Sequence, residues 1–282
     1  MLNAGLILEG GGMRGAYTAG VLDCLIDNKI YFKNVYGVSA GSCHACSYLS
    51  QQKERAIHTI TDYLDDKNYA SFYSLVKTGD FFGAKMVYDD IPNKLIPFDY
   101  QTFIDSPMNL YAILTNCRTG KAEYHLLKDL YVDTIKIRAS SSLPLLSKMV
   151  SIDNELYLDG GISDSIPLEF SQVQGNKKNV IVLTQHSGYK KKPNRLTSIM
   201  KLFYKKYPLL INAIKTRHLK YNDTLELIEK GKKDNTVFVI QPKNPVKIGR
   251  LEKDTAKLWD LYKEGYYDML DNLDKMIEFI KE

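Results

Sequence analysis

The sequence predicts an α/β protein with three layers, in which helices cover both faces of a largely parallel central sheet. Short apolar runs alternate along the chain with segments whose apolar residues repeat at helical spacing. Two of the apolar runs lead directly into a glycine-containing turn and then a helix, the order that builds parallel strands. With 282 residues, 44% hydrophobic and 25% charged, the chain is long enough for one large domain or two small ones.

The amino-terminal part begins with two strand–turn–helix units. We expect a strand at residues 5–9, a glycine loop at 10–15, a helix at 16–27, a strand that ends at residue 38 and a helix that continues to about residue 52. Residues 53–66 are predicted to be helical. Residues 72–88 are rich in aromatic side chains and fit either a pair of helices or a loop that lines a cleft.

The middle of the chain contains two hairpin patterns. We expect paired strands at 109–115 and 122–126, a helix at 132–140, and a second hairpin at 149–158. The runs at 179–184 and 236–240 are apolar and bounded by polar residues, as in strands covered on both faces. From residue 250 onward the sequence predicts one or two amphipathic helices.

No internal repeat or low-complexity linker divides the chain, so we predict a single domain spanning residues 1–282. Its motifs lie within residues 4–184, and the last strand and helices occupy about 236–282. Between these parts, a basic helical insertion covers about 189–233, and Pro208 is expected to break it in two.

A short motif, Gly37-Val38-Ser39-Ala40-Gly41, joins the second strand to its helix. This arrangement puts a serine on a sharp turn with its hydroxyl exposed above the sheet. Glycines two residues before and after Ser39 are expected because a side chain there would collide where the strand and the helix pass closest. We interpret Ser39 as a nucleophile; the alternative is a tight turn rich in small residues.

The first turn, Gly10-Gly11-Gly12-Met13-Arg14-Gly15, has the spacing of a dinucleotide-binding loop. That function needs an acidic residue at the end of the second strand, where this sequence has Ser39 instead. A P-loop would need Gly-Lys-Ser or Gly-Lys-Thr after the glycines, and neither is present. The amides of Gly10, Gly11 and Gly12 are therefore expected to face Ser39 and to bind the oxyanion that forms when serine attacks a carbonyl. Dinucleotide binding remains the alternative.

Serine is a weak nucleophile unless a base lies within hydrogen-bonding distance. In Asp159-Gly160-Gly161, a carboxylate at the end of an apolar strand is held on a tight turn, so Asp159 is the predicted proton acceptor. An Asp that merely starts a turn is one alternative. Another is a triad, which His186 or His218 would complete in the usual chain order. The other histidines, His44, His58 and His125, precede Asp159 and break that order.

Taken in this order, the three motifs resemble those of the patatin-like phospholipase family. The resemblance spans about residues 4–184, and residues 139–144 are similar to the small-residue, proline-ended segment that precedes the family's aspartate. It implies a Ser39–Asp159 dyad without histidine and an oxyanion hole in the glycine loop. The remaining motif residues are implied to support the site: Met13, Arg14, Gly15, Gly37, Val38, Ala40, Gly41, Gly160 and Gly161.

The same resemblance implies a bacterial patatin-like acyl hydrolase that cleaves carboxylic-ester bonds in lipids, of the phospholipase A, lysophospholipase or esterase type. No metal or organic cofactor is implied. One departure is Glu9, where many members have Asp before the glycines, and the match is loose beyond residue 190. The rival hypothesis is a weakly active or non-catalytic relative that binds lipid or protein.

Two further features allow other interpretations. Cys43 and Cys46 have the spacing of a redox pair, but a metal site would need two more ligands, and small-residue packing beneath Ser39 explains them equally well. Residues 190–220 contain ten Lys and Arg and no Asp or Glu, which suits contact with an anionic membrane; a solvated helical face is the alternative. No recognition motif for nucleic acid accompanies them. With no visible secretory signal and no apolar run near ~20 residues, we expect a cytoplasmic protein with peripheral membrane contact.

Overall fold

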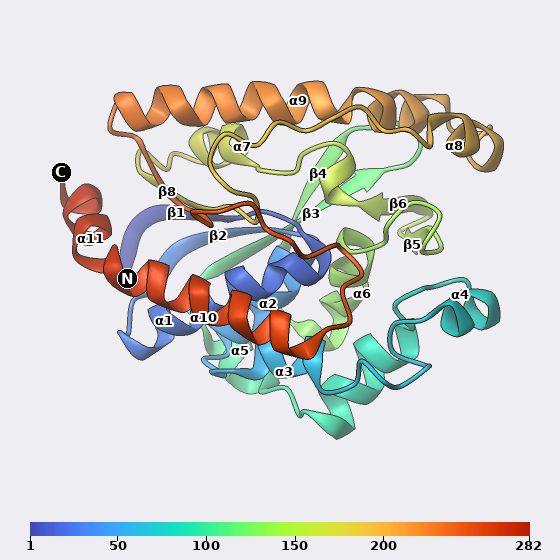
Figure 1. Cartoon of the computed structure of the whole chain (residues 1–282), viewed down its shortest axis with the longest axis horizontal. Helices are drawn as coiled ribbons and strands as arrows, with labels where there is room; N and C mark the ends of the chain where they lie inside the picture. Colours follow the sequence, from blue (N-terminus) through green and yellow to red (C-terminus); the bar gives the residue numbers. More distant parts are fainter.

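The computed structural model describes residues 1–282 and has three layers, with a central sheet between two layers of helices (Figure 1). The strands are β1 (Leu2–Leu8), β2 (Phe32–Val38), β3 (Asn109–Asn116), β4 (Ala122–Leu127), β5 (Val150–Ile152), β6 (Glu155–Asp159), β7 (Asn179–Val182) and β8 (Val237–Ile240). The predicted α/β/α class is confirmed.

The helices agree with most of the predicted segments. The α-helices are α1 (Ala16–Asp27), α2 (Ala40–Leu49), α3 (Arg55–Thr61), α4 (Phe72–Thr78), α5 (Tyr100–Asp105), α6 (Leu130–Ser140), α7 (Leu168–Val173), α8 (Thr197–Phe203), α9 (Pro208–Lys233), α10 (Thr255–Asp271) and α11 (Leu273–Lys281). Short 3-10 turns, η1 (Gly12–Gly15) and η3 (Gly160–Ile162), follow β1 and β6, and η2 (Met86–Leu95) is a π-helix.

The sheet is largely parallel, as predicted. Strands β1, β2, β3, β7 and β8 run parallel in the order β3-β2-β1-β7-β8, while β4, β5 and β6 pair antiparallel at the β3 end. Because β1 and β2 are adjacent and parallel, the loops that follow them open at the same edge of the sheet. The glycine loop and the serine turn therefore lie side by side.

Two strands meet end to end along one edge of β3. Strand β2 pairs with β3 as far as Val38, which lies opposite Ile113. Strand β6 runs antiparallel to β3 and ends with Asp159 opposite Leu114. Since β4 occupies the other edge of β3 over these residues, β6 must share the β2 edge. The register thus brings the residue after Val38, which is Ser39, next to Asp159.

Both faces of the sheet are covered, and each covering buries its own apolar cluster. Helices α1, α2 and α10 lie on one side and α7 and α9 on the other (Figure 1). The cluster on the α1 side contains 48 buried residues, and the one beneath α7 and α9 contains 11. The central strands accordingly have buried residues on both faces, and β7 is buried throughout.

Helices α1 and α10 pack at unusually short range through one glycine on each. A Cβ built on Gly20 would lie 1.9 Å from the carbonyl oxygen of Tyr262, and one built on Gly265 would lie 2.1 Å from that of Tyr17. Three tyrosine–aspartate hydrogen bonds cross the same contact: Tyr17 to Asp268 (2.9 Å), Tyr262 to Asp23 (2.8 Å) and Tyr266 to Asp27 (2.7 Å). Helix α10 is therefore held closely against α1, the first α-helix of the chain.

Some boundaries differ from the prediction for local reasons. Helix α2 ends at Leu49 and α3 begins only at Arg55, because Gln51 and Glu54 adopt left-handed backbone angles (φ 54° and 60°) that interrupt the helix. Residues 72–88 form α4, a non-helical connection at 79–83 and the start of η2, and Phe82, Val87 and Tyr88 line the cavity beside Ser39, so each of the two alternatives is correct in part. Pro208 begins α9, as expected.

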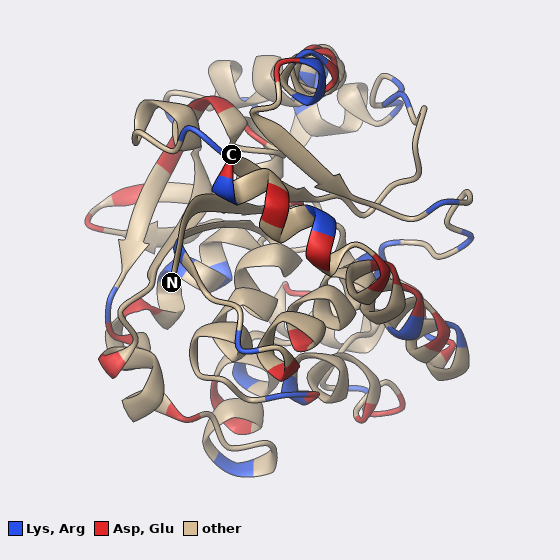
Figure 2. Ribbon diagram, turned by 90° about the vertical axis from the view of Figure 1, so that its left-hand side faces the viewer, with Lys and Arg blue, Asp and Glu red and all other residues tan.

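Figure 2 shows both termini on one face, where acidic and basic positions are interleaved along the helices.

Candidate active site

Ser39 lies between β2 and α2 in a conformation that few side chains adopt. Its φ is 54° and its ψ −123°, so the turn is strained in the way a nucleophile elbow requires. A Cβ on Gly37 would lie 2.5 Å from the Cα of Ser42, and one on Gly41 would lie 2.5 Å from the carbonyl oxygen of Leu8. These close approaches account for both glycines of the motif.

The serine turn is held by hydrogen bonds from outside the motif. The Ser39 amide donates to the Ser140 hydroxyl (3.0 Å), which in turn donates to the Ile113 carbonyl (2.7 Å). Ser42 closes the turn by donating its hydroxyl to the Ser39 carbonyl (2.7 Å). Ser140, which is fully buried, therefore ties the nucleophile turn to β3. In the sequence, Ser140 is marked only by its place in the run of serines at 140–142, so its contact with the serine turn could not be predicted.

The glycine loop presses against the serine turn and leaves its amides free. A Cβ on Gly10 would lie 2.9 Å from the Val38 carbonyl oxygen and 3.0 Å from the Ser39 Cβ. No backbone or side-chain acceptor in the protein binds the amides of Gly10, Gly11 or Gly12. The next amide, that of Met13, instead donates to the carbonyl of Arg250 (3.2 Å).

The amino end of α2 adds two further free donors. The amides of Ala40 and Gly41 have no protein acceptor, as expected for the first turn of a helix. They follow Ser39 directly, where the helix dipole also favours negative charge. Donors from α2 and from the glycine loop are therefore available on either side of Ser39.

Asp159 is buried at the end of β6, with 3% of its surface exposed. Its Oδ1 accepts a hydrogen bond from the Gly161 amide (2.8 Å), and its own amide donates to the Ser142 carbonyl (2.8 Å). A Cβ on Gly160 would lie 2.0 Å from the Ile113 carbonyl oxygen, which explains the glycine after the aspartate. The other carboxylate oxygen, Oδ2, is buried and has no hydrogen-bond partner.

The structure brings Ser39 and Asp159 to adjacent ends of β2 and β6, but their side chains are not hydrogen bonded to each other. The Ser39 hydroxyl makes no hydrogen bond, so it is free to rotate. Leaving a buried carboxylate oxygen without a donor is costly, so the unpaired Oδ2 of Asp159 requires an explanation. Catalytic hydrogen bonds are often formed only when substrate is present.

None of the five histidines contacts Ser39. His186 and His218 bond to the nearby carbonyls of Ser187 and Lys215, respectively. His58 pairs with Asp62 on the surface, and His125 lies 3.4 Å from Glu123 on β4. His44 is buried in α2, where burial lowers its pKa to about 4 and keeps the imidazole neutral.

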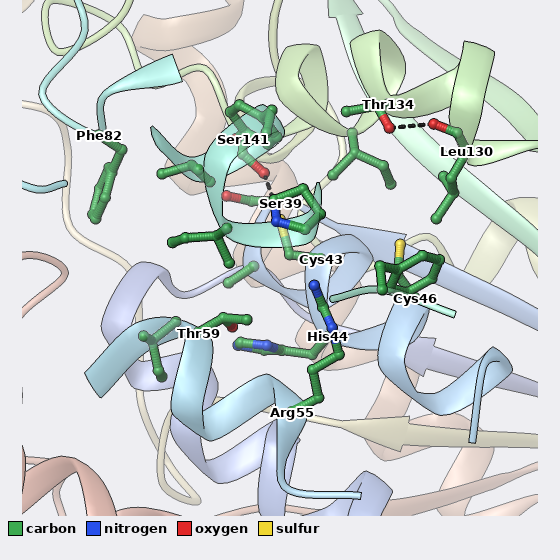
Figure 3. Close-up of a pocket in the computed structure, with 18 of the residues that line it drawn as sticks. Ser39, Cys43, His44, Cys46, Arg55, Thr59, Phe82, Leu130, Thr134 and Ser141 are labelled. Atoms are coloured by element: carbon green, nitrogen blue, oxygen red, sulfur yellow. Dashed lines mark hydrogen bonds between the residues drawn. The ribbon is translucent and has the colours of Figure 1, made fainter. Parts of the chain in front are cut away.

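An apolar cavity of about 170 Å³ opens beside Ser39 (Figure 3). It is formed by α2, α3, η2 and α6, and its wall includes Phe82, Leu130 and Cys43. Most of its 23 lining residues are hydrophobic. A space of this character next to a nucleophile suits an acyl chain.

The cysteine pair belongs to the wall of this cavity. The Cys43 and Ser141 side chains share a hydrogen bond (3.3 Å), and Cys46 donates to the Ser42 carbonyl (3.3 Å). Both thiols are free, and burial raises the pKa of each. Protonated thiols are weak metal ligands and weak nucleophiles, so packing explains Cys43 and Cys46 better than redox or metal chemistry.

Glu9 anchors the base of the glycine loop. It is almost fully buried, and its Oε2 accepts hydrogen bonds from the amide (2.7 Å) and hydroxyl (3.0 Å) of Thr184. Its Oε1 accepts one from the Tyr221 hydroxyl (2.8 Å). Glu9 therefore links the ends of β1 and β7 to α9.

A serine on a strained turn, with free amides close to it and an unpaired buried carboxylate nearby, has the groups that serine hydrolysis of an ester requires. The chain belongs to the patatin-like phospholipase family, whose model matches residues 6–170. A second model, described as a domain of unknown function (DUF6363), matches residues 207–281. Family membership supports hydrolase activity toward lipids.

Individual proteins are also similar to this chain. The uncharacterized protein YjjU of Escherichia coli (strain K12) is 28% identical over 267 residues, which is 92% of this chain and 74% of the relative. The probable lipid hydrolase 463L of Invertebrate iridescent virus 6 is 24% identical over 207 residues, or 66% of this chain and 71% of the relative. Among solved structures, VipD from Legionella pneumophila matches with a TM-score of 0.46 at 12% identity, covering 96% of this chain and 67% of that one.

No helix combines the length and hydrophobicity required to span a bilayer.

Proposed function

We propose that this protein is a serine-dependent lipid acyl hydrolase, of the phospholipase A, lysophospholipase or esterase type, that uses a Ser39–Asp159 dyad. The observation that supports the proposal is the end-to-end meeting of β2 and β6 on β3, since Asp159, whose Oδ2 has no hydrogen-bond partner, ends the strand beside the serine turn. The free loop amides and the apolar cavity support it.

In the first half-reaction, the Ser39 Oγ attacks the acyl carbonyl while its proton passes to Oδ2 of Asp159. The new oxyanion accepts hydrogen bonds from the free amides of the 10–12 loop and of Ala40. Each such donor stabilises the transition state by roughly 3–4 kcal/mol. Collapse of the tetrahedral intermediate breaks the ester bond, and the Asp159 proton goes to the leaving alcohol.

In the second half-reaction, Asp159 takes a proton from water, and the hydroxide attacks the acyl–serine ester. The intermediate expels Ser39, which recovers its proton from Asp159, and releases a fatty acid. This chemistry requires no metal or organic cofactor. The apolar cavity beside Ser39 would hold the acyl chain.

A fluorophosphonate probe tests the proposal, because only an activated serine reacts with it. We expect labelling of the wild type and none of Ser39→Ala. Asp159→Asn should abolish ester hydrolysis, whereas His186→Ala should keep most of it. Equal labelling of wild type and Ser39→Ala would exclude the enzyme in favour of the non-catalytic alternative. Loss of activity in His186→Ala with retention in Asp159→Asn would indicate a triad.

Peripheral membrane contact is proposed for the basic helical segment. Helix α8 exposes apolar side chains, including Leu202 (73% exposed) and Phe203 (68%), among lysines such as Lys201 and Lys205. Such a surface fits an anionic bilayer. Co-sedimentation with phosphatidylglycerol vesicles should fall severalfold in Phe203→Ser. Equal sedimentation of this variant and the wild type would mean that α8 is a solvated face.

A further inference from the structure

A second cavity, of about 570 Å³, lies under the segment that leads into α8 and against the first half of α9. Its lining contains no Asp or Glu. Apart from the phenol of Tyr189, the titratable side chains in its wall are all basic: Lys190, Lys191, Lys192, Arg217, His218 and Arg250. A cavity with one sign of charge concentrates ligands of the opposite sign.

This cationic cavity adjoins the active site. A Cβ on Gly161 would lie 2.9 Å from a terminal nitrogen of Arg217, so the guanidinium reaches the turn that follows Asp159. The backbone of Arg250 binds the glycine loop through Met13. Leu143 lines both this cavity and the apolar cavity that holds Ser39. A ligand in the cationic cavity would therefore lie close to the proposed catalytic pair.

The carboxylates of Glu9 and Asp159 compensate these positive charges only in part. Lys191, Arg217 and Arg250 form no salt bridge. The Nε of Arg217 is buried without a hydrogen-bond partner, and its terminal nitrogen makes only a long contact with Ser165 (3.4 Å). Glu9, a buried carboxylate nearby, is already bound by Thr184 and Tyr221. Burying unpaired charge is unfavourable, so an anionic ligand would stabilise this arrangement.

The pKa values of these groups reflect the same imbalance. Burial, reinforced by the charge of Arg217, lowers the pKa of Lys191 to about 7. Burial also lowers the pKa of Arg217 to about 10, and the charge of Arg250 adds to the effect. A bound anion would shift both values upward.

We propose that this cavity, whose wall includes Lys191, Arg217 and Arg250, binds the phosphate group of a lipid headgroup. Arginine donors match phosphate oxygens in pairs, and Lys191 adds a compact charge. The apolar part of the wall, which includes Leu143 and Met200, would contact the glycerol and the start of the acyl chain. This inference rests on the proposed function only in that Ser39 is taken as the reacting group.

Direct binding measured on Ser39→Ala protein tests the proposal without turnover. The ligands are an alkyl-ether lysophosphatidylglycerol, which has no ester to cleave, the matching alkylglycerol, and inorganic phosphate. We expect the phosphate-bearing lipid to bind at least 10-fold tighter than the alkylglycerol. Adding Lys191→Met or Arg250→Met should each weaken it by about 10-fold, the factor typical of a charged hydrogen bond. Lys215→Met, an exposed position on α9, is the matched control and should leave binding unchanged.

Equal affinity for the ether lipid and the alkylglycerol would overturn the proposal. Inorganic phosphate binding as tightly as the lipid would also overturn it, because the site would then serve a free anion. Equal binding by the Lys215→Met and Lys191→Met proteins would locate the phosphate elsewhere. Circular dichroism and the melting temperature show whether each variant is folded. If wild-type protein instead fails the fluorophosphonate test while these binding results hold, the dyad is wrong and the phosphate site stands.

Discussion

Replacing Gly265 with alanine sets two physical effects against each other. Alanine is the better helix former, so propensity alone would stabilise α10 by about 1 kcal/mol. The new methyl group would lie 2.1 Å from the Tyr17 carbonyl oxygen, with the Tyr17 carbonyl carbon and Cα at 2.9 and 3.1 Å. All three atoms are backbone, so no side chain can turn aside, and the two helices must separate.

Overpacking of this kind costs about 1–3 kcal/mol. Separation would also stretch the tyrosine–aspartate hydrogen bonds across the contact, so we expect a net loss of about 1–2 kcal/mol in the free energy of unfolding. For a chain of this size, that lowers the melting temperature by a few degrees. Urea denaturation and calorimetry measure both quantities.

The control for this experiment is Lys263→Ala, at an exposed position two residues earlier on the same helix. It should change the free energy of unfolding by less than ~0.5 kcal/mol. If Gly265→Ala proves as stable as the wild type, or more so, the gain in helix propensity exceeds the cost of overpacking. The argument that α1 and α10 pack too closely for a methyl group would then be wrong.

Three further predictions follow from buried polar groups. Ser140→Ala removes the acceptor of the Ser39 amide, so kcat should fall by about 10-fold with little change in KM; restoration by Ser140→Thr would separate positioning from general destabilisation. Burial raises the pKa of Asp23 to about 6, so the folded state holds an extra proton between about pH 4 and 6, and stability should fall as the pH rises through that range. Relative to Asp23→Asn, which cannot titrate, the wild type should lose up to about 3 kcal/mol, and a constant difference from pH 4 to 7 would refute the argument. Because Lys191 loses its proton near pH 7 in the free protein, ether-lipid affinity should decline from pH 6 to 9, whereas a flat profile would mean that Lys191 is not a ligand. The groups around Lys191 are Arg217, Tyr189, Tyr221, Glu9, Arg14 and Arg250.

Much of the fold was predictable because its signals are local. The serine turn and the glycine loop each lie within a few residues, and their glycines mark close contacts that only a missing side chain permits. The apolar runs predicted the strands in the right order. The position of Asp159 at the end of a strand could also be predicted from the sequence, because the strand and the turn that follows it are contiguous in the chain.

Other features depend on contacts between distant segments. The meeting of β2 and β6 on one edge of β3 is a matter of register, which no local pattern shows. The sequence shows that residues 190–220 are strongly basic. It does not show that Lys191 and Arg217 line a cavity together with Arg250, because Arg250 lies far away in the chain. Likewise, Gly20 and Gly265 are unremarkable in sequence until the two helices are seen to cross.

The two regions matched by separate family models share one sheet, because β7 from the middle of the chain pairs with both β1 and β8. We therefore expect residues 1–282 to unfold as a single unit. A single calorimetric transition with equal calorimetric and van't Hoff enthalpies would agree with this expectation, and two resolved transitions would contradict it.

The end-to-end junction of β2 and β6 also determines when in its own synthesis the protein acquires reactivity. A nascent chain that has reached α2 already contains the serine turn, yet the aspartate that would take its proton follows 120 positions later. Strand β6, which carries this aspartate at its end, pairs with the part of the β3 edge that β2 leaves open. On the proposed mechanism, a nascent chain that ends before β6 thus carries a serine without its proton acceptor and is inactive toward lipids.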